Sequence, residues 1–232
     1  NKKQSHEAQL IADHADLIPD VVAIATEHEN IATNRDLLRA IRAELKETEN
    51  ENIRNQTLPP LNGTWRTIVV DPPWPMKKIP REVRPNQVDD LDYPTMSLED
   101  IASLPIDGKM EPASHLYLWT TQKFLPYAFT LIEAWKFDYL FTMVWHKAGG
   151  FQPVGLAQFN CEFGLVARRG GLKFLETTDF KTCFEAGRRE HSRKPDEFYS
   201  LVRRVSPEPR LDWFAREAHE GFDTYGKETD KF

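Results

Sequence analysis

The chain has 232 residues, of which 40% are hydrophobic and 28% are charged, with a formal net charge of −6 and two cysteines. This composition excludes a disordered chain, no apolar run reaches the length of a membrane span, and two cysteines form neither a disulfide framework nor a zinc-ligand set. We therefore expect one sizeable α/β domain with a small appendage, in the cytoplasm or another reducing intracellular compartment.

Residues 1–57 lack glycine and show a helical scatter of alanine, leucine, isoleucine and glutamate. Asn34 suits the N-cap of a helix over residues 35–49. Its apolar residues form one stripe on a charged surface: Leu37, Leu38, Ile41 and Leu45. We predict that residues 1–57 are a small helical N-terminal extension of a domain spanning residues 58–232. We favour packing of the stripe on that domain over a dimer or partner interface.

A strand is predicted at residues 67–70, because consecutive β-branched and apolar residues suit a sheet covered on both faces. Asp71, Pro72 and Pro73 must end it, since neither proline can donate a ladder hydrogen bond. The rigid corner that results lies at the carboxyl end of a strand, where open α/β sheets bind ligands. Its carboxylate and carbonyls can accept two hydrogen bonds from an amino group while the Trp74 ring holds a planar ring. The alternative is an ordinary turn with Trp74 capping the core.

A proline-rich segment over residues 75–93 follows the corner. A structureless stretch of this length is usually functional or disordered. We interpret it as a lid over the corner, with a solvated surface loop as the alternative. Its basic residues are Lys77, Lys78, Arg81 and Arg84.

The rest of the chain alternates between strands and helices. Strands are predicted at residues 115–119, 139–145, 162–168, 211–215 and 222–225, and helices at residues 123–136 and 194–205. The alternation predicts an α/β fold with a parallel, doubly wound, Rossmann-like sheet and helices on both faces.

Several families of enzymes are disfavoured by missing motifs. The sequence contains no G-x-G-x-x-G, no Walker loop, no G-x-S-x-G elbow and no cluster with metal-ligand spacing, so we predict no metal site. Chemistry is therefore expected at the Asp71 corner and at the dense polar turn over residues 191–195. The negative net charge argues against nucleic-acid binding over the whole surface. Residues 187–216, however, carry eight basic against five acidic side chains, so any nucleic-acid surface is predicted in the C-terminal half.

Five motifs follow one another in a single order. They are Asp71-Pro72-Pro73-Trp74, Tyr93-Pro94-Thr95-Met96, Leu116-Tyr117-Leu118-Trp119, His191-Ser192-Arg193-Lys194-Pro195-Asp196-Glu197 and Leu211-Asp212-Trp213-Phe214-Ala215-Arg216. Over residues 58–228 this series resembles the MT-A70 family of S-adenosylmethionine-dependent adenine N(6)-methyltransferases. The order, with the acidic corner first, resembles that of permuted (β-type) amino-methyltransferases. Within the family the sequence looks closer to bacterial and phage members than to the eukaryotic messenger-RNA enzymes.

The resemblance implies a site with an acceptor half and a cofactor half. In the acceptor half, Asp71 and the Pro72 carbonyl accept the two N–H groups of an adenine amino group, so that the nitrogen lone pair points at the methyl sulfonium. Trp74 or Tyr93 stacks on the base, which is taken out of its helix. In the cofactor half, Lys194 pairs with the methionine carboxylate at a helix start. The implied catalytic residues are Asp71, Pro72, Pro73 and Trp74.

The resemblance also implies further contacts. Those to the cofactor are Asp71, His191, Ser192, Lys194, Phe214, Arg216, Lys227 and Glu228, and those to the substrate are Tyr93, Lys77, Arg81, Arg84, Glu162 and Arg188. Lys227 departs from the asparagine that the family usually has at this place, whereas Glu228 keeps the acceptor capacity of the acid or amide that usually follows. An ion pair inside the loop layer is the alternative for Glu162, and an ordinary solvated charge is the alternative for Arg188.

We therefore predict an enzyme that uses S-adenosylmethionine to methylate N(6) of adenine in nucleic acid, with DNA favoured over RNA. A homodimer or a partner subunit is expected, and no membrane. The alternatives are an RNA adenine methyltransferase, a non-catalytic nucleic-acid-binding subunit of a methyltransferase complex, and a small-molecule amino-methyltransferase.

Overall fold

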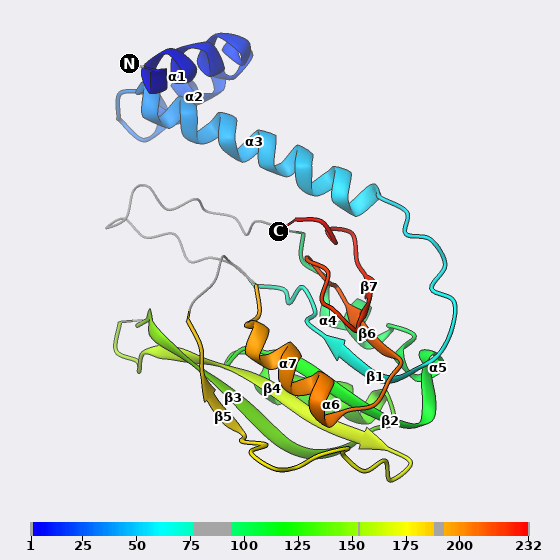
Figure 1. Cartoon of the computed structure of the whole chain (residues 1–232). Helices are drawn as coiled ribbons and strands as arrows, with labels where there is room; N and C mark the ends of the chain where they lie inside the picture. Colours follow the sequence, from blue (N-terminus) through cyan, green and yellow to red (C-terminus); the bar gives the residue numbers. More distant parts are fainter. Residues whose placement is uncertain (1, 77–93, 153, 188–192, 232) are drawn as a thin grey trace. The chain divides into compact units, whose positions relative to one another are not determined.

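Figure 1 shows the computed structural model, which describes residues 2–76, 94–152, 154–187 and 193–231. The chain divides into two units. One contains the N-terminal residues up to 56, and the other contains residues 57–75 and the chain from residue 95 onward. The predicted domain ranges, 1–57 and 58–232, stay a prediction.

The N-terminal unit is helical. Its elements are α1 (Lys2–Asp13), the 3-10 helix η1 (Ala15–Leu17), α2 (Ile18–Glu27) and α3 (Asn34–Asn55). The N-cap of α3 is Thr33 rather than the predicted Asn34, because Thr33 forms a capping box with Asp36. The Thr33 hydroxyl accepts a hydrogen bond from the Asp36 N–H at 3.3 Å, and the Asp36 carboxylate accepts one from the Thr33 N–H at 3.0 Å. Leu37 and Ile41 of the predicted stripe are buried.

The second unit is built on a sheet with the strand order β5-β3-β4-β2-β1-β6-β7, as far as the structure describes the chain. The strands are β1 (Trp65–Val70), β2 (Met110–Thr120), β3 (Asp138–Phe151), β4 (Phe159–Arg169), β5 (Cys183–Glu185), β6 (Arg210–Trp213) and β7 (Asp223–Tyr225). The helices are α4 (Leu98–Ala102), α5 (Ile106–Lys109), α6 (Leu125–Ala134) and α7 (Asp196–Val205). The prediction of a Rossmann-like α/β fold is confirmed, whereas the short elements β5 and α5 were not predicted.

The sequence predicted a uniformly parallel sheet, and this prediction is wrong because the sheet is mixed. Strand β1 runs parallel to β2 and β6, but β4 runs antiparallel to both β2 and β3. The reason is the connection between β3 and β4, which covers only residues 152–158. A parallel pair needs a crossover of a dozen or more residues, whereas an antiparallel pair needs only a short turn.

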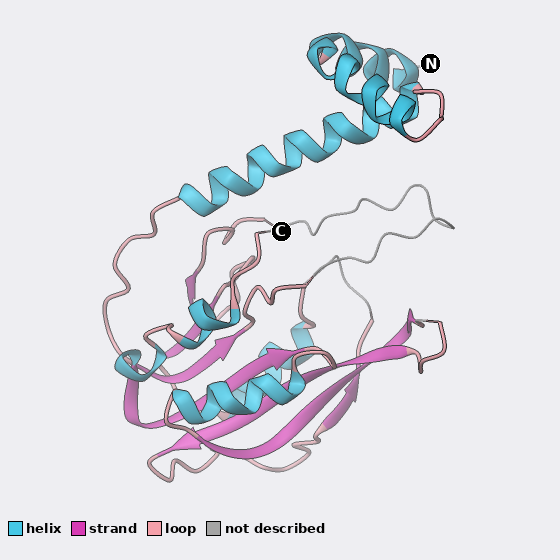
Figure 2. Cartoon of the chain, turned by 180° about the vertical axis from the view of Figure 1, so that it is seen from behind, coloured by secondary structure: helices cyan, strands magenta, loops and turns pink. Residues whose placement is uncertain are grey.

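Helices cover both faces of the sheet. Helix α7 lies in front of the sheet in Figure 1, and α6 lies in front of it when the molecule is turned by 180° in Figure 2. Alternate residues of a strand point to opposite faces, and Tyr117 and Trp119 of β2 pack with Phe198 of α7. Among the described helices, none combines the length and the apolar character that crossing a membrane requires.

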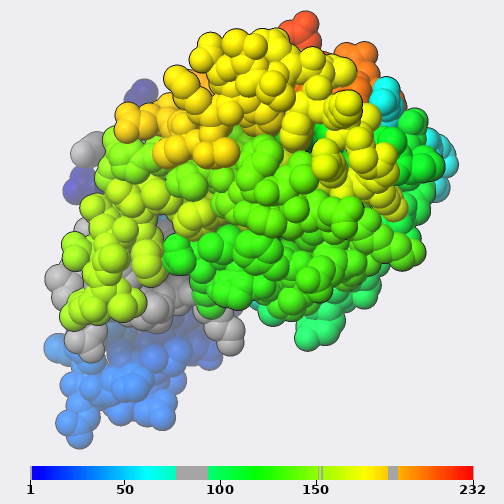
Figure 3. All heavy atoms as spheres, turned by 90° about the horizontal axis from the view of Figure 1, so that it is seen from below, coloured from blue at the N-terminus to red at the C-terminus, as the bar shows by residue number. Residues whose placement is uncertain are grey.

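The hairpin of β3 and β4 ends in an exposed tip. Its tip forms the yellow-green projection at the left of Figure 3. Val154, Leu156 and Phe159 expose much of their apolar surface there.

Candidate active site

The candidate site forms where β1 and β6 end side by side. Val70 lies opposite Trp213 in the parallel register, and the Asp71 N–H donates to the Trp213 carbonyl at 3.5 Å. Parallel strands present their carboxyl ends at the same edge, where α/β sheets bind ligands. The predicted strand thus delivers Asp71 to the expected edge.

The proline corner is fixed by backbone hydrogen bonds. The Trp74 N–H donates to the Pro72 carbonyl at 2.8 Å, and the Met96 N–H donates to the Pro73 carbonyl at 2.9 Å. The Pro72 carbonyl, predicted to accept an amino N–H of the substrate, therefore already accepts one hydrogen bond. A carbonyl oxygen has two lone pairs, so a second donor can still be accommodated.

Trp74 supports the corner from inside the core. Its indole stacks on Phe124 at 5.1 Å between ring centres, and its N–H donates to the Trp119 carbonyl at 3.1 Å. The residue is only 4% exposed, so the ring has no open face for a base in this structure. The geometry favours the capping role over the predicted base stacking, because the apolar ring is more stable against Phe124 than in water.

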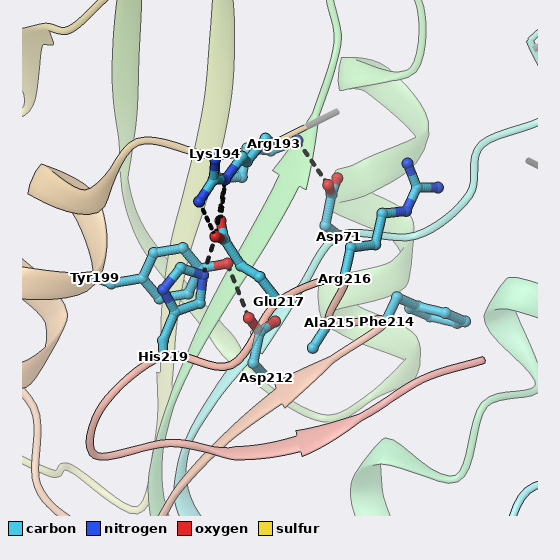
Figure 4. A pocket seen from close by; sticks show the side chains of 10 residues that line it. All are labelled: Asp71, Arg193, Lys194, Tyr199, Asp212, Phe214, Ala215, Arg216, Glu217 and His219. Carbon is cyan, nitrogen blue, oxygen red and sulfur yellow. Dashed lines mark hydrogen bonds and ion pairs between the residues drawn. The ribbon is translucent and has the colours of Figure 1, made fainter. Parts of the chain in front are cut away.

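Lys194 joins the two predicted halves of the site. Its ammonium nitrogen lies 2.6 Å from Oδ2 of Asp71 (Figure 4) and 3.3 Å from Oε2 of Glu162. The side chain is almost fully buried, and its nitrogen lies 5.3 Å from the centre of the Trp119 ring. The predicted acceptor carboxylate and the predicted cofactor cation therefore form one ion pair.

Glu162 reaches this edge only because β4 is antiparallel. Thr120 at the carboxyl end of β2 pairs with Phe163 near the start of β4, which places Glu162 beside the site. Burial by itself would raise the pKa of Glu162, but Lys194 and Lys147 outweigh it and hold the pKa below its usual value. Glu162 is thus an ionised member of an ion-pair network. This agrees with the alternative role considered for it from the sequence, an ion pair rather than a substrate contact.

A buried acid lies beneath the Asp71–Lys194 pair. Asp212 of β6 is opposite Val69 in the register, and its Oδ2 accepts a hydrogen bond of 2.8 Å from the Tyr199 hydroxyl. Burial raises the pKa of Asp212 to about 7. Neither residue was predicted as part of the site, although a carboxylate among the apolar residues of the predicted strand at residues 211–215 was a usable signal.

The segment after β6 is held by a charged contact to Arg193, just before α7, and by an aromatic contact to α7 itself. Arg193 Nε donates to both carboxylate oxygens of Glu217 at 2.8 Å, and Nη2 adds a further bond. The His219 ring stacks on the Tyr199 ring at 3.4 Å between centres. Neither Glu217 nor His219 was predicted, because both lie in an irregular segment without a motif.

These residues line one pocket (Figure 4). Its lining is Asp71, Arg193, Lys194, Tyr199, Asp212, Phe214, Ala215, Arg216, Glu217 and His219. Asp196, Glu217 and His219 also bring possible ligand atoms within 4.8 Å of one another. The Arg193 guanidinium already occupies both oxygens of Glu217, so the geometry favours the ion pair over a bound cation, and the prediction of no metal stays a prediction.

The predicted cofactor residues after β6 are only partly brought together. Phe214 and Arg216 line the pocket, and the φ of 71° at Phe214 turns the chain sharply where the strand ends. Arg216 Nε lies 3.4 Å from Oε2 of Glu228. Lys227 and Glu228 themselves do not line the pocket.

Several predicted site residues fall outside the described part of the chain. They are Lys77, Arg81, Arg84, Tyr93, Arg188, His191 and Ser192. Their roles stay predictions.

A family model described as MT-A70 matches residues 65–228. Similar proteins include an N(6)-adenosine-methyltransferase MT-A70-like from Arabidopsis thaliana, 27% identical over 72% of this chain and 24% of the relative. A probable N(6)-adenosine-methyltransferase MT-A70-like from Oryza sativa subsp. japonica is 27% identical over 77% of this chain and 25% of the relative. The N(6)-adenosine-methyltransferase subunit METTL3 of Danio rerio is 23% identical over 66% of this chain and 26% of the relative. The chain spans about a quarter of the length of these curated relatives.

Proposed function

The chain belongs to the MT-A70 family, and we propose that it transfers a methyl group from S-adenosylmethionine to the N(6) amino group of adenine in nucleic acid. Methyltransferases of this family use S-adenosylmethionine as the methyl donor. The observation that carries the proposal is the 2.6 Å pair between Asp71 and Lys194. At one edge of the sheet, Asp71, whose carboxylate can accept hydrogen bonds from an amino group, lies beside Lys194, whose ammonium can pair with the methionine carboxylate.

The side chains have distinct roles in the proposed reaction. S-adenosylmethionine supplies an electrophilic methyl carbon on a sulfonium. Asp71 and the Pro72 carbonyl accept the two amino N–H groups, which frees the nitrogen lone pair to form the new N–C bond while the S–C bond breaks. The proton that the nitrogen then carries leaves to solvent or to Asp71. Their contribution is orientation and stabilisation of developing positive charge.

Lys194 holds the cofactor in this proposal. A methionine carboxylate entering the pocket competes with Asp71 for the Lys194 ammonium, because both need the same cation. Arg216, which lines the pocket with Phe214, is proposed to face the ribose hydroxyls.

The nucleic acid of the proposal is DNA. We keep the preference for DNA that the sequence suggested, together with a bacterial or phage origin and an intracellular location. The relatives named above are called adenosine methyltransferases, and one of them is called a subunit. These names support RNA as the competing substrate, and they support a partner subunit or second copy.

One experiment tests substrate and activity together. The protein is incubated with methyl-labelled S-adenosylmethionine and matched DNA and RNA oligonucleotides, each single- and double-stranded, and N(6)-methyladenine is quantified by mass spectrometry. The proposal predicts methyladenine in DNA above that in RNA. Methylation of RNA alone would correct the substrate, and no product with any of the oligonucleotides would contradict the proposed methylation of nucleic acid.

A further inference from the structure

Four charged side chains form a row of alternating sign at the site. Lys147 bonds to Glu162, Glu162 lies 3.3 Å from Lys194, and Lys194 lies 2.6 Å from Asp71. Three of the four have side chains that are 20% exposed or less, so water screens their interactions only weakly. Lys147 is the end of the row farthest from Asp71, and it does not line the pocket.

Sheet geometry puts the row on the face that α7 covers. Trp145 is directly opposite Glu162 in the antiparallel pair of β3 and β4. Lys147 follows Trp145 by two residues and therefore points to the same face. Cross-strand neighbours at this diagonal are close enough for long side chains to meet.

Two indole rings form a floor under the two lysines. The Lys147 nitrogen lies 4.8 Å from the centre of the Trp145 ring, and the Lys194 nitrogen lies 5.3 Å from that of Trp119. The two rings contact each other edge to face at 6.3 Å. The faces of indole rings attract cations, so this indole floor (Trp119 and Trp145) favours a fixed place for each ammonium group.

Lys147 and Lys194 contact the same Glu162 carboxylate. Lys147 holds that carboxylate from one side, and its positive charge repels Lys194. Without Lys147, the attraction between Glu162 and Lys194 would be opposed less. The ammonium would then shift toward Glu162 and away from Asp71 and the pocket.

We infer that Lys147 and Glu162 are positioning residues that set Lys194 where it can receive the carboxylate of the cofactor. The inference rests on the proposed function, since it assumes that Lys194 binds that carboxylate. Lys147 acts through Glu162 and touches no substrate. This role is separate from the substrate contact that the sequence suggests for Glu162.

Binding of two ligands distinguishes a displaced Lys194 from general damage to the pocket. S-adenosylhomocysteine carries the amino-acid carboxylate, whereas 5′-methylthioadenosine keeps the adenosine part and lacks that carboxylate. Both are titrated calorimetrically into wild type, Lys147→Met, Lys147→Arg and Glu162→Gln. Lys173→Met is the matched control, because Lys173 is an exposed lysine. Thermal unfolding of each variant verifies that it is folded.

The inference predicts that Lys147→Met and Glu162→Gln weaken S-adenosylhomocysteine binding about tenfold, a typical loss for coupled charged neighbours. Binding of 5′-methylthioadenosine should be unchanged, and Lys147→Arg and Lys173→Met should bind both ligands as wild type does. Unchanged affinity of Lys147→Met, or an equal loss for both ligands, would overturn the inference and leave the proposed function intact. Failure of the folded wild type to bind either ligand would instead remove the proposed function and the inference with it.

Discussion

The ammonium group of Lys194 lies 2.6 Å from the carboxylate of Asp71, although 123 residues separate them in the chain. Asp71 directly follows β1, and Lys194 lies just before α7, so the fold brings the two side chains together. An ammonium and a carboxylate at this distance form a charge-assisted hydrogen bond, which is about twice as strong as a neutral one. Removal of either member leaves a poorly solvated charge without this partner.

Lys194→Met should abolish most of the cofactor affinity. The loss of one partner of a desolvated charge pair costs about 2–5 kcal/mol, which corresponds to roughly thirtyfold or more in the dissociation constant. Calorimetry with S-adenosylhomocysteine measures the effect, and Lys173→Met serves as the control. Retention of wild-type affinity by folded Lys194→Met would remove Lys194 from the cofactor site.

Trp74→Ala should destabilise the protein by about 3–5 kcal/mol, the usual cost of truncating a buried tryptophan. The reason is the loss of the Phe124 contact and of the hydrogen bond to the Trp119 carbonyl. Trp74→Phe retains the ring contact and should lose less. Urea denaturation gives the free energies of unfolding, with exposed Leu175→Ala as the control. A loss for Trp74→Ala no larger than that of the control would show that the indole is not a core residue.

Asp212 should make the stability fall as the pH rises from about 4 to about 7. Burial raises its pKa in the folded protein to about 7, above the ordinary value of 3.8. Between these values the unfolded chain has released the proton that the folded protein still holds, so rising pH favours unfolding. Asp212→Asn keeps an acceptor for Tyr199 and removes this dependence. Denaturation is measured at pH 4.5 and pH 8, values that bracket most of this window. Relative to wild type, Asp212→Asn should be more stable at pH 8 than at pH 4.5. The same stability difference between the two proteins at both pH values would contradict the raised pKa of Asp212.

Arg193 and Glu217 should be energetically coupled. Their paired hydrogen bonds at 2.8 Å fasten the segment after β6 to the residue before Lys194. A double-mutant cycle with Arg193→Gln and Glu217→Gln, read out by urea denaturation, should give a coupling energy of about 1–2 kcal/mol. Additive effects of the two changes would mean that the contact does not stabilise the site.

The sequence predicted the parts of the site that local chemistry determines. The β-branched run before Asp71 and the two prolines after it require a strand and a corner, and the structure contains both. The helix predicted to start at Lys194 also followed from the proline after it, although α7 begins two residues later, at Asp196. These features depend on a few neighbouring residues, so they can be read without the fold.

Other parts depend on tertiary contacts and could not be predicted. The antiparallel direction of β4 delivers Glu162 to the site. It depends on how far β3 and β4 continue beyond the predicted residues 139–145 and 162–168, because only residues 152–158 then remain to connect them. Trp74 was predicted to stack on the substrate base. The sequence does not reveal whether its ring faces the site or the core, and the structure shows that it packs on Phe124 in the core. Glu217 acquires its role only through Arg193, which lies 24 residues earlier.

The most direct test of the central claim is methyl transfer by Asp71→Asn. Methyl-labelled S-adenosylmethionine and an adenine-containing oligonucleotide are supplied to wild type, Asp71→Asn and Asp138→Asn, an exposed aspartate at the start of β3. We predict that wild type and Asp138→Asn form N(6)-methyladenine, and that Asp71→Asn is slower by about a hundredfold or more, because the lost carboxylate both orients the amino group and stabilises its developing charge. Wild-type turnover by correctly folded Asp71→Asn would contradict the account.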